Sequence, residues 1–487
     1  MADDKKLDYG KIGLKAGLEI HQQLDTGKLF CKCPGHLRKD EPDFIFRRKL
    51  HAVAGETGEI DEAVKHESII DREFIYQGYK DNVCLIDMDE EPPKMINENA
   101  LKEVLKICLL MNCEIYSNSM IMRKTVIDGS NTSGFQRTVL IGHDGWIDTS
   151  FGKVGIESVC LEEDSARVIE KDEKKAIYRL DRLGIPLVEI ATKPELDTPE
   201  KIKECALKIG EILRACNVRR GIGTIRQDLN VSIKGHDRVE IKGFQDPKIM
   251  IETVNNEIKR QQEEVKKGKK TGEVRNALVN AESEFLRPMP GKARMYPETD
   301  LPLLKIGRKN LDDLSSNLPK LKNELRQELK KKGLGDEMIH LVLDENYDDF
   351  ESLIHVYAED VNLVGKMITL WRFDIARKYD KGDDEIKIIL NLEILKDILK
   401  LLGDGKISKN DVKEVMQKIV EGEDLEKAIK FERVSNKEME EAIRNMIIDK
   451  PGLRPNAYMG LAMKEFKGKI DAKKAMEIIN QILEGGK

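Results

Sequence analysis

The sequence predicts an α+β protein in which a mixed sheet comes first and helices alone follow. Short runs rich in β-branched and other apolar residues recur up to about residue 300 and predict strands. The clearest runs are Leu14–Gln23, Ile156–Leu161, Leu187–Ile190, Thr224–Ile233 and Arg238–Ile241. From Asn310 onward, apolar residues recur every three or four positions instead, which is typical of amphipathic helices. These two patterns divide the chain near residue 300.

Helices and a hairpin are also expected within the mixed part. Residues 97–111 and 251–265 repeat apolar side chains at helical spacing. Thr198 suits an N-cap and Pro199 the first helical position, so a helix is expected to begin there. The two last strand-type runs are separated by Gly235–Asp237, which predicts a hairpin turn.

Glycines punctuate the helical part and suggest a further division. A row of leucines on one face opens it, and glycines then separate short helices. These glycines are Gly333, Gly382, Gly403 and Gly422. We expect three domains, over residues 1–304, 305–410 and 411–487, the last with its own break at Pro451-Gly452. A chain of 487 residues is consistent with about three domains.

Composition predicts a cytoplasmic protein with no membrane segment. The first six residues have no apolar run, and no apolar stretch approaches the roughly 18 residues that a membrane span needs. The net charge is −6, so binding of nucleic acid would need locally concentrated positive charge. Lys266–Lys270 and Lys330–Lys332 are two such runs, although lysine runs are more often solvated helix ends.

Eight cysteines in so long a chain do not predict a disulfide framework. Cys31 and Cys33 form a C-x-C pair that could hold zinc together with His36 or His51. Reduced thiols without a metal are the simpler interpretation, and Cys84 stands apart further along the chain.

The stretch from Met122 to Arg137 predicts a site for an anion. Lys124 and Arg137 supply positive charge that can neutralise phosphate or carboxylate oxygens. Between them, Ser130, Asn131 and Thr132 offer hydrogen-bond donors on a glycine-flanked run. A polar surface loop would have a similar composition.

Acidic residues on strands predict a divalent cation site. Alternate side chains of a strand share a face, so Glu19 and His21 should lie side by side. Glu189 sits inside an otherwise apolar strand, where a carboxylate needs a partner or a cation. Glu162 and Glu163 end another strand and should point to opposite faces. Carboxylates converging in this way suit Mg²⁺, whereas a half-exposed polar sheet face would also explain them.

Familiar nucleotide-binding motifs are missing. The sequence contains no G-x-x-x-x-G-K-[ST] loop and no G-x-G-x-x-G fingerprint. Any nucleotide would therefore have to be held by a metal ion, basic side chains and backbone amides.

The ordered set of motifs resembles the GatB/GatE family of glutamyl-tRNA(Gln) amidotransferase subunits, and the archaeal E type most closely. The motifs that carry the resemblance are Gly17–Thr26, Leu29–Pro34, Asp89–Pro93, Met122–Thr138, Leu161–Asp164, Arg182–Glu189, Arg226–Ser232, Val239–Gly243 and Arg294–Asp300. The resemblance spans nearly the whole chain. Tyr458–Lys469 adds a resemblance to the YqeY type of tail.

The resemblance implies a fold and an activity. It implies a cradle-shaped catalytic domain followed by an all-helical domain and a YqeY-like tail, the latter two gripping tRNA. The expected enzyme is an ATP-dependent carbon–nitrogen ligase that phosphorylates the glutamyl side chain of Glu-tRNA(Gln). Ammonia then displaces the phosphate to give Gln-tRNA(Gln). The ammonia would come from an asparaginase-like glutaminase subunit of the GatD type, in an α2β2 heterotetramer.

The resemblance also implies site residues. His21, Glu162 or Glu163, and Glu189 would hold Mg²⁺, with Glu19 nearby. Chemistry alone assigns phosphate charge to Lys124, Arg137 and Arg182, and ATP or substrate contacts to the small polar residues. Those residues are Ser130, Asn131 and Thr132.

One departure from the family concerns an insertion. The E type usually carries a segment resembling part of aspartyl-tRNA synthetase between the Val239–Gly243 and Arg294–Asp300 motifs. Only about fifty residues separate these motifs here, and they predict a helix and a linker. Two other functions stay open, a non-catalytic tRNA-binding adaptor and a metal-dependent hydrolase on a similar sheet.

Overall fold

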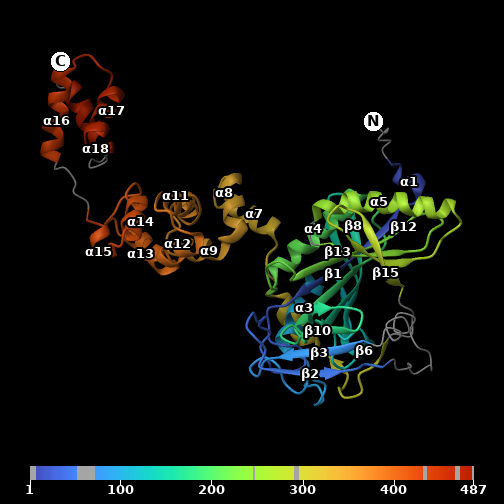
Figure 1. Ribbon diagram of the computed structural model, residues 1–487. Coiled ribbons are helices and arrows are strands. Elements are labelled where there is room, and N and C mark those ends of the chain that lie inside the picture. Colours follow the sequence, from blue (N-terminus) through green and yellow to red (C-terminus); the bar gives the residue numbers. More distant parts are fainter. Residues whose placement is uncertain are drawn as a thin grey trace. The chain divides into compact units, whose positions relative to one another are not determined.

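The computed structural model describes residues 7–51, 72–244, 247–289, 295–430, 436–466 and 472–484 (Figure 1). The expectations that involve Met1–Lys6, Arg294 and residues 467–469 lie outside these ranges. The chain forms two compact units, Met1–Leu321 and Lys322–Lys487. The first is mixed α/β and the second is helical, as the sequence predicts.

An 11-stranded mixed sheet dominates the first unit. Its strand order is β15-β14-β13-β12-β1-β11-β8-β7-β6-β16, and β4 pairs with β7. The strands are β1 (Lys15–Gln23), β4 (Glu114–Ile115), β6 (Ile121–Thr125), β7 (Phe135–Thr149), β8 (Gly152–Glu163), β11 (Pro186–Thr192), β12 (Ile225–Ser232), β13 (Val239–Phe244), β14 (Glu273–Ala277), β15 (Ser283–Pro288) and β16 (Met295–Pro297). Strand β1 lies inside the sheet, so both of its edges are paired.

Three long helices pack on one face of this sheet, namely α3 (Glu98–Leu110), α4 (Pro199–Ala215) and α5 (Pro247–Lys266). The strands turn alternate side chains toward them: Leu18 and Ile20 of β1 and Ile190 of β11 are buried in the shared apolar core. The side chains between these residues face the other way. Because the helices cover the apolar face of the sheet, polar side chains can occupy the opposite face.

Local signals predicted these elements correctly. Asn97 caps α3, Thr198 accepts a hydrogen bond from the Lys201 amide, and Pro199 is the first residue of α4. The predicted hairpin is β12–β13, with Val231 opposite Val239. Gly235 adopts a φ of +92° in its turn, a conformation that side chains with a Cβ rarely adopt.

The expected linker before residue 294 is wrong. After α5 the chain forms the β14–β15 hairpin, which extends the sheet beyond β13. Val274 is fully buried there, and that burial favours a strand over a solvated linker.

Smaller sheets complete the first unit. Strands β2 (Phe44–Arg48), β3 (Glu73–Gly78), β10 (Lys175–Arg179) and β9 (Arg167–Lys171) form a four-stranded sheet over an aromatic cluster. Strand β5 (Asn118–Ser119) pairs with β17 (Leu304–Lys305). Two short helices, α1 (Tyr9–Ile12) and α6 (Arg308–Ser315), belong to the same unit.

The second unit is helical throughout its described residues. One apolar cluster runs from Leu329 to Ala428 and another from Met439 to Ile479. Its elements are α7 (Lys322–Lys331), α8 (Asp336–Glu345), α9 (Tyr347–Ile354), α10 (Val361–Lys366), the π-helical turn η1 (Met367–Trp371), α11 (Arg372–Lys378), α12 (Asp383–Ile389), α13 (Leu392–Gly403), α14 (Val412–Val420), α15 (Leu425–Ala428), α16 (Asn436–Asp449), α17 (Pro455–Phe466) and α18 (Ala472–Glu484). The predicted glycines lie within two residues of helix ends, and Pro451-Gly452 separates α16 from α17. The domain limits at 304 and 410, the cradle shape and the YqeY-like tail stay predictions.

Within the described residues, we find no helix with both the length and the apolar character that crossing a membrane requires.

Candidate functional site

The polar face of the central sheet brings Glu19, His21 and Glu189 together. On β1, Glu19 and His21 are two residues apart and point to the same face. On β11, Glu189 lies directly opposite His21 in the strand register. On the other side of β1, Arg226 of β12 is the register partner of His21. The alternation that buries Leu18 and Ile20 under the helices therefore gathers these polar groups on the reverse side.

The distances define a compact donor set. The Nε2 atom of His21 lies 3.1 Å from Oε2 of Glu189 and 3.5 Å from Oε1 of Glu19. One donor atom from each of the three side chains lies within 4.8 Å of the others. Carboxylate oxygens suit a hard divalent ion such as Mg²⁺, and the imidazole nitrogen is a ligand for Mn²⁺ or Zn²⁺ as well. The three residues therefore fit a divalent cation.

Glu162 joins this group through Lys124. The Nζ atom of Lys124, on β6, lies 3.1 Å from Oε1 of Glu162 and 3.3 Å from Oε2 of Glu189. Gln136 of β7 donates a further hydrogen bond to Glu162, at 3.2 Å. Glu162 is 2% exposed, so its charge is largely removed from water. We refer to Glu19, His21, Glu162 and Glu189 as the carboxylate cluster.

The pKa values in the carboxylate cluster reflect crowded negative charge. Burial, together with the charge of Glu189, raises the pKa of Glu19 to about 7 and also raises the pKa of Glu162. Burial opposes a charged imidazole, but the hydrogen bond and charge of Glu189 outweigh it and raise the pKa of His21. Although burial acts against ionisation of Glu189 too, Lys124 and His21 lower its pKa. The cluster therefore keeps Glu189 ionised and favours an added cation.

Glu163 lies on the other face of the sheet, away from the cluster. Its carboxylate accepts a hydrogen bond from the Arg137 amide at 3.2 Å and lies 3.4 Å from Nη1 of Arg137. Arg137 also donates from Nε to Glu298 at 2.7 Å, and Arg123 reaches the same Glu298 at 2.5 Å. The positive charge of Arg137, which is 6% exposed, is thus already matched by two carboxylates.

The small polar residues of the 126–134 loop are engaged within the protein. Thr132 donates to the Asp87 carbonyl at 2.6 Å, and Ser130 donates to Asp128 at 2.6 Å. The side-chain oxygen of Asn131 accepts from Ser165 at 3.1 Å. Asn131 and Thr132 are almost fully buried. These contacts fix the loop, and the structure does not place these side chains among the cluster residues.

Arg182 contacts Ser165, Ala166 and Asp164, and none of these partners belongs to the carboxylate cluster. It donates to the carbonyls of Ser165 and Ala166, at 2.7 and 2.9 Å. Its Nε lies 3.8 Å from the buried carboxylate of Asp164, which Arg226 also contacts at 3.0 Å. Arg182 thus helps to balance the charge of Asp164.

A second charged group, centred on Lys242, continues the same face. The Nζ atom of Lys242 lies 2.6 Å from Asp228 and 2.5 Å from Glu240. Burial opposes the ammonium, but Asp228, Glu240 and Glu19 outweigh it and raise the pKa of Lys242. Sequence reasoning did not single out Lys242. The pairing of β12 with β13 is the signal that could have found it, since Asn230 faces Glu240 in the register.

The thiols of Cys31, Cys33 and Cys84 form a separate cluster with Asp87, in which donor atoms lie within 4.8 Å of one another. Hydrogen bonds from Cys31 and Cys33 lower the pKa of Cys84. Lys28 is fully buried and lies 3.1 Å from Asp87. Three sulfurs and one carboxylate are a suitable set for tetrahedral zinc. His36 and His51, suggested by the sequence as further ligands, do not belong to this cluster.

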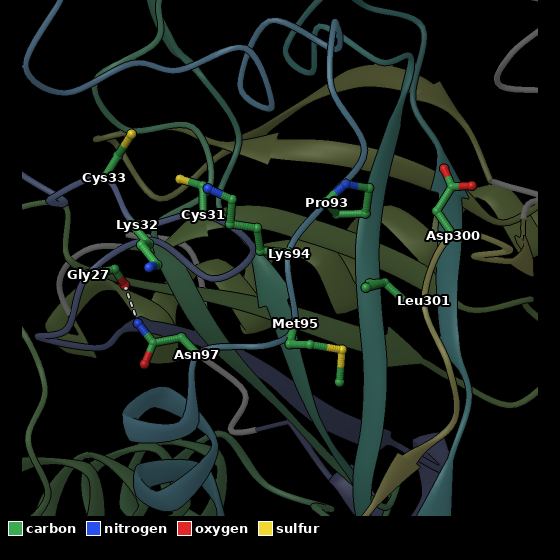
Figure 2. A pocket seen from close by; sticks show the side chains of 10 residues that line it. All are labelled: Gly27, Cys31, Lys32, Cys33, Pro93, Lys94, Met95, Asn97, Asp300 and Leu301. Atoms are coloured by element: carbon green, nitrogen blue, oxygen red, sulfur yellow. Dashed lines mark hydrogen bonds between the residues drawn. The ribbon is translucent and has the colours of Figure 1, made fainter.

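A cavity of about 740 Å³ opens beside the thiols. Figure 2 shows Cys31 and Cys33 on one side of it and Asp300 and Leu301 on the other, with Asn97 donating to the Gly27 carbonyl at 3.2 Å. The carboxylate cluster does not line this cavity. The thiols and the carboxylates are therefore two distinct candidate sites.

Comparisons with known proteins agree on one family. The GatB/GatE catalytic domain matches residues 14–312. The E subunit of the glutamyl-tRNA(Gln) amidotransferase from Methanocaldococcus jannaschii is 34% identical over 639 aligned positions, which cover 98% of this chain and 100% of the relative. The corresponding E subunits from Thermococcus sibiricus and Methanosarcina barkeri are 32% and 31% identical, covering 98% and 99% of this chain and 98% of each relative.

These alignments run over more positions than the 487 residues of the chain. The relatives therefore contain stretches that this chain lacks. That difference agrees with the expected absence of an insertion.

Proposed function

The chain belongs to the GatB/GatE family of tRNA-dependent amidotransferases, and from that premise we propose that it uses ATP to activate the glutamyl side chain of Glu-tRNA(Gln) for amidation. The observation that carries this proposal is the carboxylate cluster on the polar face of the central sheet. The family membership indicates the type of reaction. The carboxylate cluster provides side chains that could bind a cation next to the reacting anions.

The proposed reaction has two steps. An oxygen of the glutamyl side-chain carboxylate attacks the γ-phosphorus of ATP, and ADP leaves with the electron pair of the broken P–O bond. Ammonia then attacks the carbonyl carbon of the acyl phosphate, inorganic phosphate leaves, and a proton of the ammonia is lost to solvent. The product is the side-chain amide of Gln-tRNA(Gln). The first step brings two anions together, so the protein must offset negative charge more than it must supply a nucleophile.

The residues that would hold Mg²⁺ are Glu19, His21 and Glu189, with Glu162 alongside. When bound, Mg²⁺ would neutralise phosphate oxygens and so lower the repulsion between the reacting anions. Glu189 is the residue best kept ionised for this purpose, because the effect of burial is overcome by Lys124 and His21, which lower its pKa. In this proposal Glu163 keeps Arg137 in place behind the sheet and is not a ligand.

Two ammonium groups flank the carboxylate cluster, and we propose that they offset the negative charge of the substrate. Lys124 contacts Glu162 and Glu189, and Lys242 lies on the opposite side of β1 beside Asp228. Both are held by carboxylates in this arrangement, which fixes their position before a substrate arrives. Arg182 is proposed to support this face through Asp164.

The amidation step is proposed to need a partner subunit. Ammonia is mostly ammonium at neutral pH and then has no lone pair to donate, so it must be delivered without equilibrating with water. An asparaginase-like glutaminase of the GatD type, in an α2β2 assembly, would provide it. We further propose that the helical domains from residue 305 onward bind tRNA, with a YqeY-like tail at 411–487, and that the enzyme acts in the cytoplasm.

Transfer of radiolabel tests this function directly. The full chain is incubated with [γ-³²P]ATP, Mg²⁺ and Glu-tRNA(Gln), without ammonia, and label on the aminoacyl end is measured. The wild type should transfer label. In His21→Ala the rate of label transfer should be at least about 100-fold lower, whereas the affinity for Glu-tRNA(Gln) should stay within about twofold of the wild-type value. Binding of Glu-tRNA(Gln) with no label transfer would instead show a tRNA-binding adaptor. Phosphate release at full rate without any tRNA would show a metal-dependent hydrolase.

A further inference from the structure

Exposed cations gather where helix α5 ends against the turn between strands β12 and β13. Helix α5 packs on both strands and ends at Lys266 (Figure 1). Two contacts join its end to the turn: Nε2 of His236 lies 3.0 Å from Glu264, and the Asp237 amide donates to the Lys270 carbonyl at 2.8 Å. We refer to the exposed cations of these two segments as the basic patch, namely Lys234, Arg238, Lys266, Lys267, Lys269 and Lys270.

The positive charge of the basic patch is not matched within the protein. Among the described residues, none of its six side chains forms an ion pair or a hydrogen bond. Two exposed acids, Asp237 and Glu263, lie in the same segments, whereas Glu264 is already paired with Arg260 at 2.8 Å. The basic patch therefore keeps a positive excess on a chain whose net charge is −6.

The end of a helix explains only part of this charge. A lysine in the last turn offsets the partial negative charge of a helix end, and Lys266 is placed for that role. Lys269 and Lys270 lie beyond the helix, and Lys234 and Arg238 belong to the other segment. Because like charges repel one another, this arrangement does not stabilise the fold. It is the kind of surface that a polyanion binds.

The basic patch lies well away from the carboxylate cluster. Glu19 faces Asp228 in the register of β1 and β12, and Lys234 follows Asp228 by six residues along the chain. At about 3.3 Å for each extended residue, the nearest part of the patch is roughly 20 Å from the cluster. A ligand that contacts both places must therefore be far larger than a single phosphate group.

The composition of the basic patch favours nucleic acid over a protein or lipid surface. Lysine supplies most of its cations, and lysine is depleted in the interfaces between proteins. Neither segment exposes a large apolar side chain, which the centre of a protein interface or a membrane anchor would need. Phosphate groups of a nucleic-acid backbone require only positive charge that can reach them.

We propose that the basic patch binds the phosphodiester backbone of the tRNA, outside its single-stranded 3′ end. Its lysines and arginine would neutralise backbone phosphates without reading the sequence of bases. The inference goes beyond the proposed function, which places tRNA on the helical domains alone, and it rests on that function for the identity of the RNA. The first unit would then hold the body of the tRNA as well as its reacting end.

Titration of the full chain with an unacylated tRNA(Gln) transcript at several salt concentrations tests the contact. Lys269→Ala/Lys270→Ala and Lys234→Ala/Arg238→Ala each remove two cations, one pair from each segment. Each double variant should bind at least about tenfold more weakly in about 0.1 M salt and should reduce the slope of log K against log salt by about 1.8. Lys269→Arg/Lys270→Arg keeps the charge and should bind within about twofold of the wild type.

A matched control is Lys102→Ala/Arg214→Ala, which removes two exposed cations from helices α3 and α4 of the same unit. It should leave the affinity and the salt slope unchanged. All these variants should keep the Tm of the wild type, because the substituted side chains are exposed. A transcript without its single-stranded 3′ end should show the same loss in both patch variants, since the proposed contact lies elsewhere on the tRNA.

Equal salt slopes in the wild type and in both alanine variants of the patch would overturn the proposal. So would an unchanged affinity for tRNA in variants that lose binding to polyglutamate or to vesicles with phosphatidylserine, which would show an acidic protein or a lipid surface as the occupant. Label transfer with an unchanged KM for Glu-tRNA(Gln) in both variants would reject the patch but leave the proposed function standing. Patch-dependent tRNA binding in a chain that transfers no label would do the reverse.

Discussion

Glu162 and Glu163 are adjacent in the chain, yet their carboxylates lie on opposite faces of the central sheet. Glu162 lies 3.1 Å from Lys124 in the carboxylate cluster, whereas Glu163 lies 3.4 Å from Arg137 behind it. The two residues end strand β8, and strand geometry alone separates them. Substitutions at these neighbouring positions should therefore have different effects.

The first prediction compares Glu162→Gln with Glu163→Gln. Glu162→Gln should weaken Mn²⁺ binding about tenfold and barely lower the Tm, because it also removes repulsion from Glu189. Glu163→Gln should leave Mn²⁺ binding unchanged but destabilise the fold by about 2 kcal/mol, because buried Arg137 keeps only Glu298 as a charged partner. Calorimetric Mn²⁺ titration and thermal melts measure both effects. Equal metal affinities in the two variants would contradict this assignment of faces.

The second prediction concerns Lys124→Met. The ammonium of Lys124 contacts oxygens of Glu162 and Glu189 that a divalent cation would also use. At pH 8, removing it should tighten Mn²⁺ binding about fivefold, because less competing positive charge is present. Label transfer from ATP should nevertheless fall more than 100-fold, because a positive group near the reacting anions is lost. Weaker Mn²⁺ binding in Lys124→Met would show that the lysine supports the metal site instead of competing with it.

Strand alternation is the part of this site that the sequence could predict. The spacing of Glu19 and His21 predicted their common face, and the apolar neighbours of Glu189 predicted that it needs a partner. Both inferences depend only on the period of a strand, which is local. The N-cap of α4 and the β12–β13 hairpin were predictable for the same reason.

Contacts between distant segments could not be predicted in this way. Arg137 has suitable chemistry for a phosphate, but its guanidinium is paired with Glu298, 161 residues further along. Cys84 looked isolated, yet the fold brings it to Cys31 and Cys33. Lys242 joins the polar face only because β12 pairs with both β1 and β13. The register of the sheet decides each of these contacts, and no local pattern encodes it.

The third prediction concerns pH and Glu19. The pKa of Glu19 is raised to about 7 from its ordinary value of 4.5 by burial and by Glu189. Between these values the folded state binds more protons than the unfolded state, so the free energy of unfolding falls as pH rises. The slope from one such group reaches about 1.4 kcal/mol per pH unit. Above pH 7 the Glu19 carboxyl is ionised in both the folded and the unfolded state, so its contribution to the free energy of unfolding no longer changes with pH.

Glu19→Gln should remove that dependence. Urea denaturation of the metal-free chain from pH 5 to 8 should show that the variant gains stability relative to the wild type as pH rises, with a plateau above pH 7. Glu204→Gln is a matched control, because its carboxylate lies on α4 and its pKa is lowered by Ser150. A constant difference between wild type and Glu19→Gln across this range would contradict the raised pKa.

The fourth prediction concerns metal at the thiol cluster. Three sulfurs and the Asp87 carboxylate lie within 4.8 Å of one another, a spacing that tetrahedral zinc with Zn–S bonds of about 2.3 Å can satisfy. We expect the chain to bind one Co²⁺ with the visible absorption of thiolate ligands, and Cys84→Ser to lose most of it. Cys216→Ser should keep it, since Cys216 is outside the cluster. Because Cys31 and Cys84 come from loops far apart in sequence, metal removal should also lower the Tm of the wild type and barely affect Cys84→Ser. An absorption that is the same in Cys84→Ser as in the wild type would show that these thiols are simply reduced neighbours.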